Sequence, residues 1–249
     1  GTPVIVARPS TTGEVSQVLA ACNELGLPVA PWGGKTGLVH GAMAGPHRAP
    51  SLARMKAIGE IVTVGHTKTA DLGARGSAMA GGILSTNAGG NRVIRFGMAR
   101  DNVLGLEAVL ADGTILSSMN HLIKNNAGYD LKQLFVGSEG TLGVITRAVF
   151  RLRPLPSSQV SAFVAVDDFD ALPSLLRHME RGLAGTLTAY EVMWREFHEL
   201  VTTPPARGRA PPARLPPTRV GSALGVALVI SACEPSAPPE VPKPRATAA

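Results

Sequence analysis

Apolar residues recur at helical spacing near the start of the chain. After a short β-branched run that ends at Pro9, residues 11–14 (TTGE) fit a capping box, in which a hydroxyl and a carboxylate satisfy the free backbone N–H groups at a helix start. Gly26 supplies the stop. One face of the predicted helix carries Val15, Val18, Leu19, Cys22 and Leu25. The pattern predicts a strand, this helix, and a second strand over residues 27–32 (LPVAPW).

The later parts of the chain alternate between strand and helix patterns. Residues 102–116 read as two strands around an Asp112-Gly113 turn, and residues 143–155 alternate as a half-buried strand does. From residue 158 the order is a strand, a helix over 169–182, a strand over 186–194 and the start of another helix. The patterns predict an α+β protein whose last layer stops before its sheet can close.

Residues 204–249 differ in composition from the rest of the chain. They hold 11 of the 20 prolines, which favours disorder. They also carry six basic and two acidic residues, or +4 of the net charge of +6. The remainder is nearly neutral and this tail has no aromatic residue for base stacking, so nucleic-acid binding is not favoured. The most apolar run, residues 220–232, is too short to span a bilayer.

A glycine-rich turn, PWGGKTGLVHGA over residues 31–42, raises the question of phosphate binding. Gly34-Lys35-Thr36 would end a P-loop, but the first glycine of that motif would fall at Val29, and no helix pattern follows. A nucleoside triphosphate is therefore not favoured. A turn rich in backbone N–H donors after a strand still suits a phosphate or a diphosphate.

Two further glycine clusters follow, at residues 71–97 and 135–146, and residues 71–98 show no helical period. Neither contains the Gly-x-Gly-x-x-Gly fingerprint of a Rossmann site, so three dispersed clusters indicate a long ligand held along its length. The six histidines have no pair at metal-ligand spacing, and two distant cysteines form neither a disulfide framework nor a metal site.

Four motifs in order give these clusters a family resemblance: PWGGKTGLVHGA, DLGARGS with its STNAGGN continuation, RDNVLGLEAVLADG and NNAGYDLKQLFVGSEGTLGVIT. Together they resemble the FAD-binding domain of the vanillyl-alcohol-oxidase (PCMH-type) flavoproteins. Within that family the chain is most similar to the D-2-hydroxy-acid dehydrogenases, whose substrates are of the lactate, glycolate and 2-hydroxyglutarate class.

The resemblance implies a domain plan. Residues 1–156 would form a two-subdomain PCMH-type FAD-binding domain, residues 157–203 the start of a substrate (cap) domain of α/β type, and residues 204–249 a proline-rich disordered tail. Near residues 65–70 the family pattern has a further strand and helix, which implies an internal deletion. The chain as a whole therefore resembles a shortened family member.

The resemblance also implies the cofactor and its contacts. FAD would lie along three segments, with the backbone N–H groups of Gly33, Gly34 and Thr36 facing its diphosphate. Lys35 stands where glycine is more usual, and is either a charged contact to the diphosphate or a solvated surface lysine. The implied cofactor-binding residues are Pro31, Trp32, Gly33, Gly34, Lys35, Thr36, Gly37, Asp71, Gly76, Ser77, Thr86, Asn87, Ala88, Gly89, Glu139, Gly140, Gly143, Val144 and Ile145.

The implied reaction is oxidation of a D-2-hydroxy acid to the 2-oxo acid by hydride transfer to FAD. The family's catalytic and metal-binding pattern is absent here, so no catalytic residue and no metal ligand is assigned. An electron-transfer flavoprotein, a cytochrome or a quinone could accept the electrons. The alternative is a catalytically inactive flavin-binding or interaction protein of the same descent. No secretory signal is seen in the chain, which favours the cytoplasm or the mitochondrial matrix.

Overall fold

The protein consists of two units, Gly1–Arg153 (unit 1) and Pro154–Ala249 (unit 2). The computed structural model describes residues 5–37, 42, 49–50, 54–55, 66–67, 77–154, 156–166, 168–194, 197, 200 and 226–234. The predicted deletion near residues 65–70 falls largely outside these ranges.

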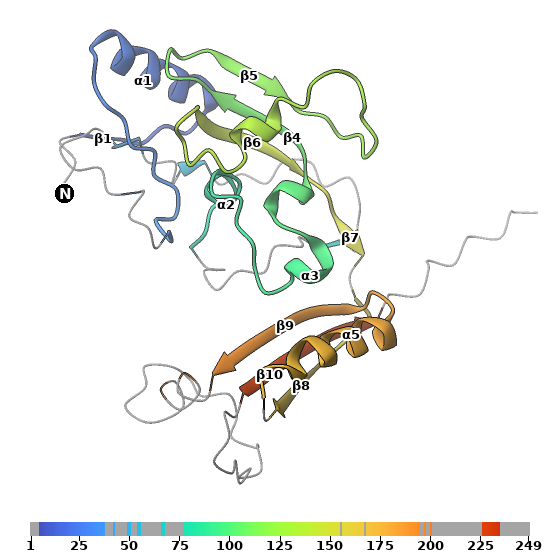
Figure 1. Cartoon of the computed structure of the whole chain (residues 1–249). Coiled ribbons are helices and arrows are strands. Elements are labelled where there is room, and N and C mark those ends of the chain that lie inside the picture. Colours follow the sequence, from blue (N-terminus) through green and yellow to red (C-terminus); the bar gives the residue numbers. More distant parts are fainter. Residues whose placement is uncertain are drawn as a thin grey trace, which may run out of the picture. The chain divides into compact units, whose positions relative to one another are not determined.

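The elements appear in Figure 1. Along the chain the structure has β1 (Val6–Ala7), α1 (Thr12–Glu24), β2 (Ala49–Pro50), β3 (His66–Thr67), α2 (Ala80–Ser85), α3 (Val93–Phe96), the 3₁₀ helix η2 (Ala99–Asn102), β4 (Val103–Val109), β5 (Ile115–Ser118), α4 (Lys132–Phe135), β6 (Val144–Phe150), β7 (Arg153–Pro154), β8 (Ser158–Val166), α5 (Ala171–Leu183), β9 (Leu187–Trp194) and β10 (Val226–Glu234).

Helix α1 begins and ends where its sequence predicts. The Thr11 hydroxyl accepts a hydrogen bond from the Glu14 N–H at 3.1 Å, while the Glu14 carboxylate accepts from the Ser10 N–H at 2.6 Å, one residue earlier than in an ideal capping box. Gly26 adopts a φ of +61° just beyond the helix, where glycine has no steric cost. The predicted helix is therefore confirmed, with both of its ends set by local chemistry.

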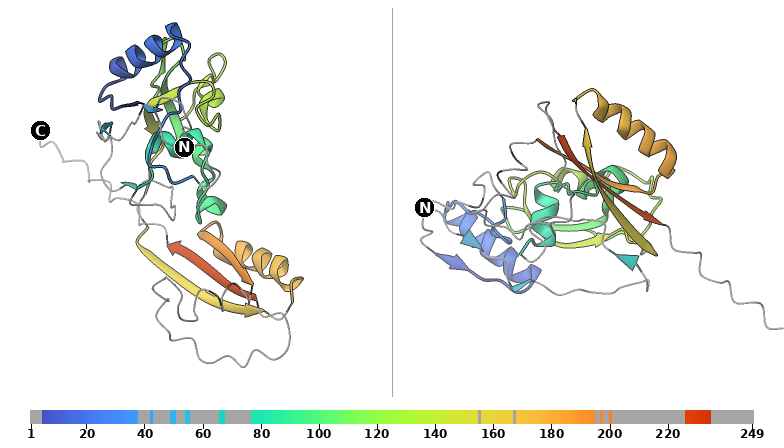
Figure 2. Two further views of the ribbon diagram at one scale, coloured as in Figure 1. Left: turned by 90° about the vertical axis from the view of Figure 1, so that its left-hand side faces the viewer. Right: turned by 90° about the horizontal axis from the view of Figure 1, so that it is seen from below.

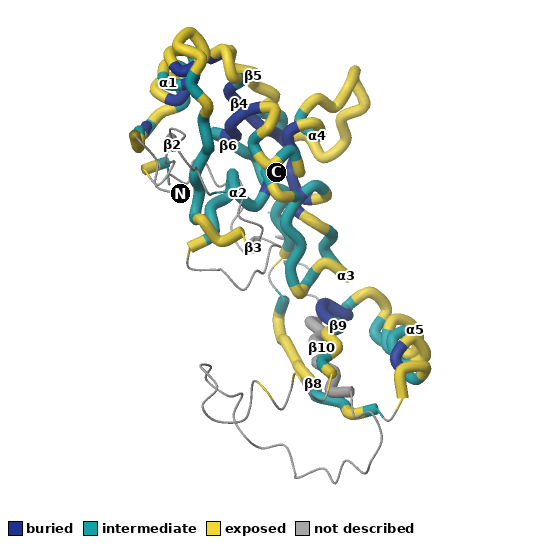
Figure 3. The backbone as a smooth tube through the Cα atoms, turned by 60° about the vertical axis from the view of Figure 1, so that its left-hand side comes forward, coloured by how far each residue is buried: buried dark blue, intermediate teal, exposed yellow. Residues whose placement is uncertain are grey.

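The centre of unit 1 is an antiparallel sheet in the order β5-β4-β6. Helix α1 covers one face, where Val15 and Leu19 pack with Val109 and Val144. Short helices cover the other face, where a second core includes Leu84, Val103, Leu106, Phe135 and Ile145. Residues of β4 reach both cores, so this strand is buried along most of its length (Figure 3). The predicted pair of strands around Asp112-Gly113 is confirmed.

One carboxylate lies inside this sheet. Glu107 on β4 is 6% exposed, and its Oε1 accepts hydrogen bonds from the Thr12 hydroxyl at 2.8 Å and the Thr146 hydroxyl at 3.0 Å. Its Oε2 lies 3.5 Å from Nη1 of Arg147, whose side chain is 61% exposed. Glu107 therefore joins the start of α1 to β4 and β6 through hydrogen bonds that are partly buried.

Replacing Glu107 by alanine should lower the free energy of unfolding of unit 1 by about 2 to 3 kcal/mol, because two hydroxyl groups lose their acceptor and a cavity opens. Replacing Arg147 by alanine should cost less than about 1 kcal/mol, since its ion pair is exposed to solvent. Urea denaturation followed by Trp32 fluorescence in a Trp194→Phe background measures both. Equal losses in the two variants would contradict the role assigned to the hydrogen bonds of Glu107.

Unit 2 is a three-stranded antiparallel sheet in the order β8-β10-β9. Helix α5 lies along one face (Figure 2), where Leu172 packs with Leu187. The predicted strand, helix and strand over residues 158–194 are confirmed. The central strand, however, comes from residues 226–234, for which the sequence predicted disorder. That prediction is wrong for this stretch, because its run of apolar and β-branched residues (VALVISACE) forms a strand that hydrogen-bonds to both neighbours.

Two other predictions differ from the structure. Residues 27–32, predicted as a strand, contain no strand and only isolated bridge residues at Val29 and Trp32. Residues 71–98, predicted to lack helix, contain the short helices α2 and α3. Glycine and alanine obscure the helical period in α2, whose sequence is AGGILS, and only Leu84 in it is buried.

Candidate functional site

The loop of residues 31–37 lies directly against the start of α2. A Cβ atom at Gly34 would collide with the carbonyl oxygen of Ser77 and lie 2.9 Å from its carbonyl carbon. At Gly33 a Cβ atom would lie 3.7 Å from Cβ of Met79 and 3.9 Å from Cα of Gly82. The two backbones therefore meet with no side chain between them, which only glycine permits at position 34.

Lys35 is the exposed residue at the turn of this loop. Its φ of +55° lies in the left-handed region, which is uncommon for a residue other than glycine or asparagine. Its Nζ lies 3.2 Å from the centroid of the Trp32 ring, and Trp32 Nε1 donates a hydrogen bond to the carbonyl oxygen of Ala42 at 2.6 Å. Thr36 and Gly37 beyond it are exposed as well.

The third glycine cluster, residues 135–146, contacts both α2 and the loop of residues 31–37. Gly137 N–H donates to the Leu84 carbonyl at 3.0 Å, and Glu139 N–H donates to the Ser85 carbonyl at 2.8 Å, so this turn caps the end of α2. At Gly140, whose φ is +84°, a Cβ atom would lie 2.8 Å from Cγ of Pro31. The structure therefore brings together the segments 31–37, 77–89 and 137–145, which we call the glycine junction.

Within the third cluster, Gly143, Val144 and Ile145 are buried. A Cβ atom at Gly143 would lie 2.7 Å from the Val109 carbonyl oxygen, and the side chains of Val144 and Ile145 belong to the two cores of unit 1. A Cβ atom at Gly81, in α2, would lie 3.1 Å from the Ile145 carbonyl oxygen. The Ile145 carbonyl oxygen therefore lies against α2, and the Ile145 side chain shares a core with Leu84 of that helix.

Residues 86–89 form the turn after α2. The Thr86 hydroxyl donates to the Gly82 carbonyl at 3.0 Å, and Asn87 has a φ of +46°. The Asn87 Oδ1 accepts a hydrogen bond from the Arg100 N–H at 2.9 Å, and the Ala88 carbonyl accepts from the Ala99 N–H at 3.0 Å. At Gly89 a Cβ atom would lie 3.0 Å from Cγ2 of Val93. The Thr86 and Asn87 side chains thus hold this turn in shape.

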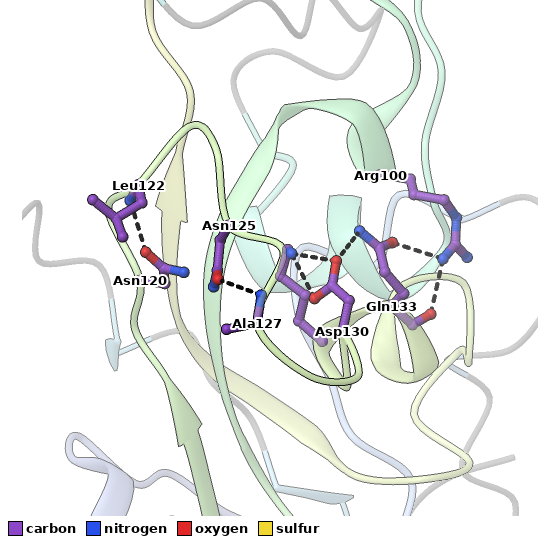
Figure 4. A network of polar contacts seen from close by, with 8 residues as sticks. Arg100, Asn120, Leu122, Asn125, Ala127, Asp130 and Gln133 are labelled. Carbon is purple, nitrogen blue, oxygen red and sulfur yellow. Dashed lines mark hydrogen bonds and ion pairs between the residues drawn. The ribbon is translucent and has the colours of Figure 1, made fainter.

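Arg100 holds the chain just before Gly137 in the glycine junction. The sequence did not indicate this role. The Arg100 Nη1 donates to the backbone oxygen and to Oε1 of Gln133, both at 2.8 Å (Figure 4). Its Nη2 donates to the Val136 carbonyl. Arg100 therefore fixes α4 and the turn that leads into Gly137. Arg100 lies within the RDNVLGLEAVLADG motif, but no spacing rule in the sequence pairs it with partners more than thirty positions further along the chain.

The loop of residues 119–131 follows β5 and is exposed over most of its length (Figure 3). Its shape is set by local hydrogen bonds from Leu122 N–H to Asn120 Oδ1 at 2.7 Å and from Ala127 N–H to Asn125 Oδ1 at 3.2 Å. Lys132 Nζ lies 2.6 Å from Oδ1 of Asp130 at its end. The loop is the most exposed part of the NNAGYDLKQLFVGSEG motif.

Positive charge gathers where β6 ends. Burial lowers the pKa of Arg153, and the charges of Arg151 and Arg95 lower it further. The Arg153 Nε atom is buried and has no hydrogen-bond partner within the part of the chain that the structure describes. Such a group favours an anion, which would offset the repulsion.

Two of the implied cofactor-binding residues, Asp71 and Gly76, lie outside the described residues. Among the residues that are described, no group of three or more His, Cys, Asp or Glu side chains could hold a metal ion. In that same part of the chain, no helix is both long and apolar enough to cross a membrane.

Comparison with known proteins gives the junction a context. The family described as FAD binding domain matches residues 53–118, which include α2 and the turn after it. Over these residues the chain is similar to the FAD-binding domain of this family. D-2-hydroxyglutarate dehydrogenase of Bos taurus is 40% identical over 224 residues, which cover 81% of this chain and 41% of the relative. The D-2-hydroxyglutarate–pyruvate transhydrogenase of Saccharomyces cerevisiae is 34% identical, over 77% of this chain and 43% of the relative.

The fold of this FAD-binding chain is shared more widely. A solved structure of alkyldihydroxyacetonephosphate synthase superposes with a TM-score of 0.69 at 20% sequence identity, covering 93% of this chain and 48% of that one. The predicted PCMH-type fold and the predicted cofactor, FAD, are thereby confirmed. The chain spans about two fifths of the length of the curated relatives it matches.

The residues of the FAD-binding domain fit this cofactor. Among the described residues, no atom that packs against Gly37 or Gly82 would lie within 4 Å of a Cβ atom built there, so this backbone has room for a ligand. Gly33, Gly34 and Gly140 let the three segments approach closely, and Lys35 adds a positive charge beside them. An open, glycine-lined backbone with a cation suits a long ligand that carries a diphosphate.

Proposed function

We propose that the glycine junction holds FAD, with the diphosphate at the loop of residues 31–37. The observation that carries this proposal is the meeting of three glycine-rich segments, where the Gly34 backbone lies against the backbone of Ser77 and the Gly140 backbone lies against the ring of Pro31. The backbone N–H groups of Gly33, Gly34 and Thr36 would bind the diphosphate oxygens. The rest of the cofactor would be lined by the backbone N–H groups of residues 86–89 and 139–145 and by the residues Asp71, Gly76 and Ser77.

The chemistry that we assign to the chain is oxidation of a D-2-hydroxy acid to its 2-oxo acid. FAD, when bound, supplies the hydride acceptor. The protein's part is to hold the cofactor rigidly and to attract an anionic substrate, a role that the charges of Arg95, Arg151 and Arg153 would favour. The proposal is supported by relatives whose names include D-2-hydroxyglutarate dehydrogenase and D-2-hydroxyglutarate–pyruvate transhydrogenase.

The substrate is of the 2-hydroxyglutarate, lactate or glycolate class. Pyruvate is one candidate electron acceptor, because the Saccharomyces relative is named for it, beside an electron-transfer flavoprotein, a cytochrome or a quinone. The mitochondrial matrix is the location that agrees with the names of the Bos taurus, Oryza sativa and Arabidopsis thaliana relatives.

Purified chain should bind FAD at one equivalent and become more stable with it. At a free FAD concentration one hundred times Kd, binding adds about 2.7 kcal/mol to the free energy of unfolding, or roughly 5 to 10 °C in Tm for a domain of this size. Visible absorbance after gel filtration and thermal melts with and without FAD measure this. A colourless protein whose Tm ignores FAD would contradict the assignment of the glycine junction.

The reaction is tested on the FAD-loaded protein without oxygen. D-2-hydroxyglutarate, D-lactate or glycolate should bleach the flavin absorbance near 450 nm, a typical position for oxidised flavin, while L-2-hydroxyglutarate should leave it unchanged. A chain that binds FAD and is bleached by none of these acids would support the alternative, a flavin-binding protein without this activity.

A further inference from the structure

Lys35 occupies a backbone conformation that its side chain does not favour. A left-handed residue other than glycine or asparagine is stable only where its surroundings hold it there. At φ +55°, Lys35 follows Gly34, whose backbone is packed against the Ser77 carbonyl, so the loop cannot relax in that direction. Something in the loop must therefore offset the cost of lysine at this position.

The Trp32 ring supplies that interaction. The Lys35 ammonium lies 3.2 Å above the ring centroid, well inside the range of a cation–π contact. The hydrogen bond from Trp32 Nε1 to the Ala42 carbonyl holds the ring at a fixed angle. Trp32 and Lys35 are thus a positioned pair that spans the Gly33-Gly34 turn from one side to the other.

We propose that this pair holds the loop of residues 31–37 in the form that accepts a diphosphate, and that the fixed ammonium adds to the attraction for the anion. The inference rests on the proposed function, since it concerns the same loop. Lys35 is then a positioning residue for the cofactor. The sequence left two interpretations of Lys35 open, and this proposal chooses the charged contact to the diphosphate over the solvated surface lysine.

The pair should affect FAD affinity through both geometry and charge. Lys35→Met keeps the strained backbone but removes the charge, and should weaken FAD binding about tenfold. Lys35→Gly removes the strain as well, yet should still weaken binding because the turn loses its fixed form. Trp32→Leu should weaken binding by a similar factor. Lys35→Arg keeps the cation over the ring and should bind FAD nearly as the wild type does.

Isothermal titration of the full chain with FAD, at low and at high salt, measures these effects. The double variant Trp32→Leu/Lys35→Met should bind about as weakly as either single variant, because the two side chains act as a unit. Lys35→Met should also show a smaller loss of affinity with salt than the wild type, which a purely structural role would not produce. Lys124→Met, a charge change in the exposed loop of residues 119–131, is the matched control and should alter neither quantity.

The outcomes separate the two proposals. If the wild-type chain does not bind FAD, the proposed function fails and this inference fails with it. If the wild type binds FAD but Lys35→Gly or Lys35→Met binds it equally well, the inference alone is overturned. Additive losses in the double variant would also overturn it. Circular dichroism of each variant shows whether the fold is kept, and Lys35→Arg supplies the decisive comparison if Trp32→Leu does not fold.

Discussion

A chain with Gly34 replaced by alanine is expected to lose FAD binding by at least about a hundredfold. The new methyl group would collide with the carbonyl oxygen of Ser77. It would also lie only 2.9 Å from the Ser77 carbonyl carbon. Neither atom is the end of a flexible side chain, so one backbone must move. Overpacking of this kind costs about 1 to 3 kcal/mol or more, and about 3 kcal/mol taken from the bound state is roughly a hundredfold in Kd.

Gly13→Ala is the matched control for that substitution. Among the described residues outside the helix's own backbone, the nearest atom to a Cβ atom at Gly13 would be the Thr11 hydroxyl oxygen at 4.0 Å, and Gly13 lies in the first turn of α1. This variant should bind FAD as tightly as the wild type. Fluorescence titration of FAD into both variants makes the comparison. Equal affinity in Gly34→Ala and wild type would show that the loop does not need its close contact with residue 77.

The glycine junction shows what the sequence could predict about the candidate site. The order of the three clusters predicted that they share one ligand, and the structure places them side by side. The pairs that touch, Gly34 with Ser77 and Gly140 with Pro31, could not be predicted, because each joins segments that are distant in the chain. Likewise, Val144 and Ile145 were predicted as cofactor contacts, and the structure adds that their side chains serve the cores of unit 1.

Residues that support the site from a distance gave no sequence signal. Arg100 binds the backbone around Gln133 and Val136, and Glu107 joins α1 to two strands. Each role depends on partners that only the folded chain brings close. A buried glutamate and a half-buried arginine look like ordinary surface charges in a sequence, since both residue types are usually exposed.

The fold was predicted best where local rules suffice. The cap of α1, the turn after β4 and the strand–helix–strand order of unit 2 follow from spacing and from a few residues. Strand β10 was missed because residues 204–249 are rich in proline, and an average over that window hides a nine-residue stretch without proline that contains Val226, Val229 and Ile230. The partners of β10 lie more than thirty residues earlier in the chain, so local patterns could not reveal the pairing.

Removing β10 should therefore unfold unit 2. In the sheet order β8-β10-β9, the outer strands hydrogen-bond to β10 and not to each other. A chain that ends at Gly225 loses both ladders at once, which leaves α5 with two unpaired strands beneath it. Amide hydrogen exchange across residues 158–194 should become faster by about a thousandfold or more, as expected for loss of a cooperative unit.

A chain that ends at Pro235 is the control, because it keeps every residue of β10 and removes only residues 236–249. It should show the slow exchange of the full chain across β8 and β9. Ile230→Pro in the full chain gives an independent test, since proline in a central strand removes a ladder N–H. In all three variants the exchange of β4 and β6 should stay slow, because unit 1 has its own cores. Slow exchange of β8 and β9 in the chain ending at Gly225 would mean that β10 is not the strand that holds this sheet together.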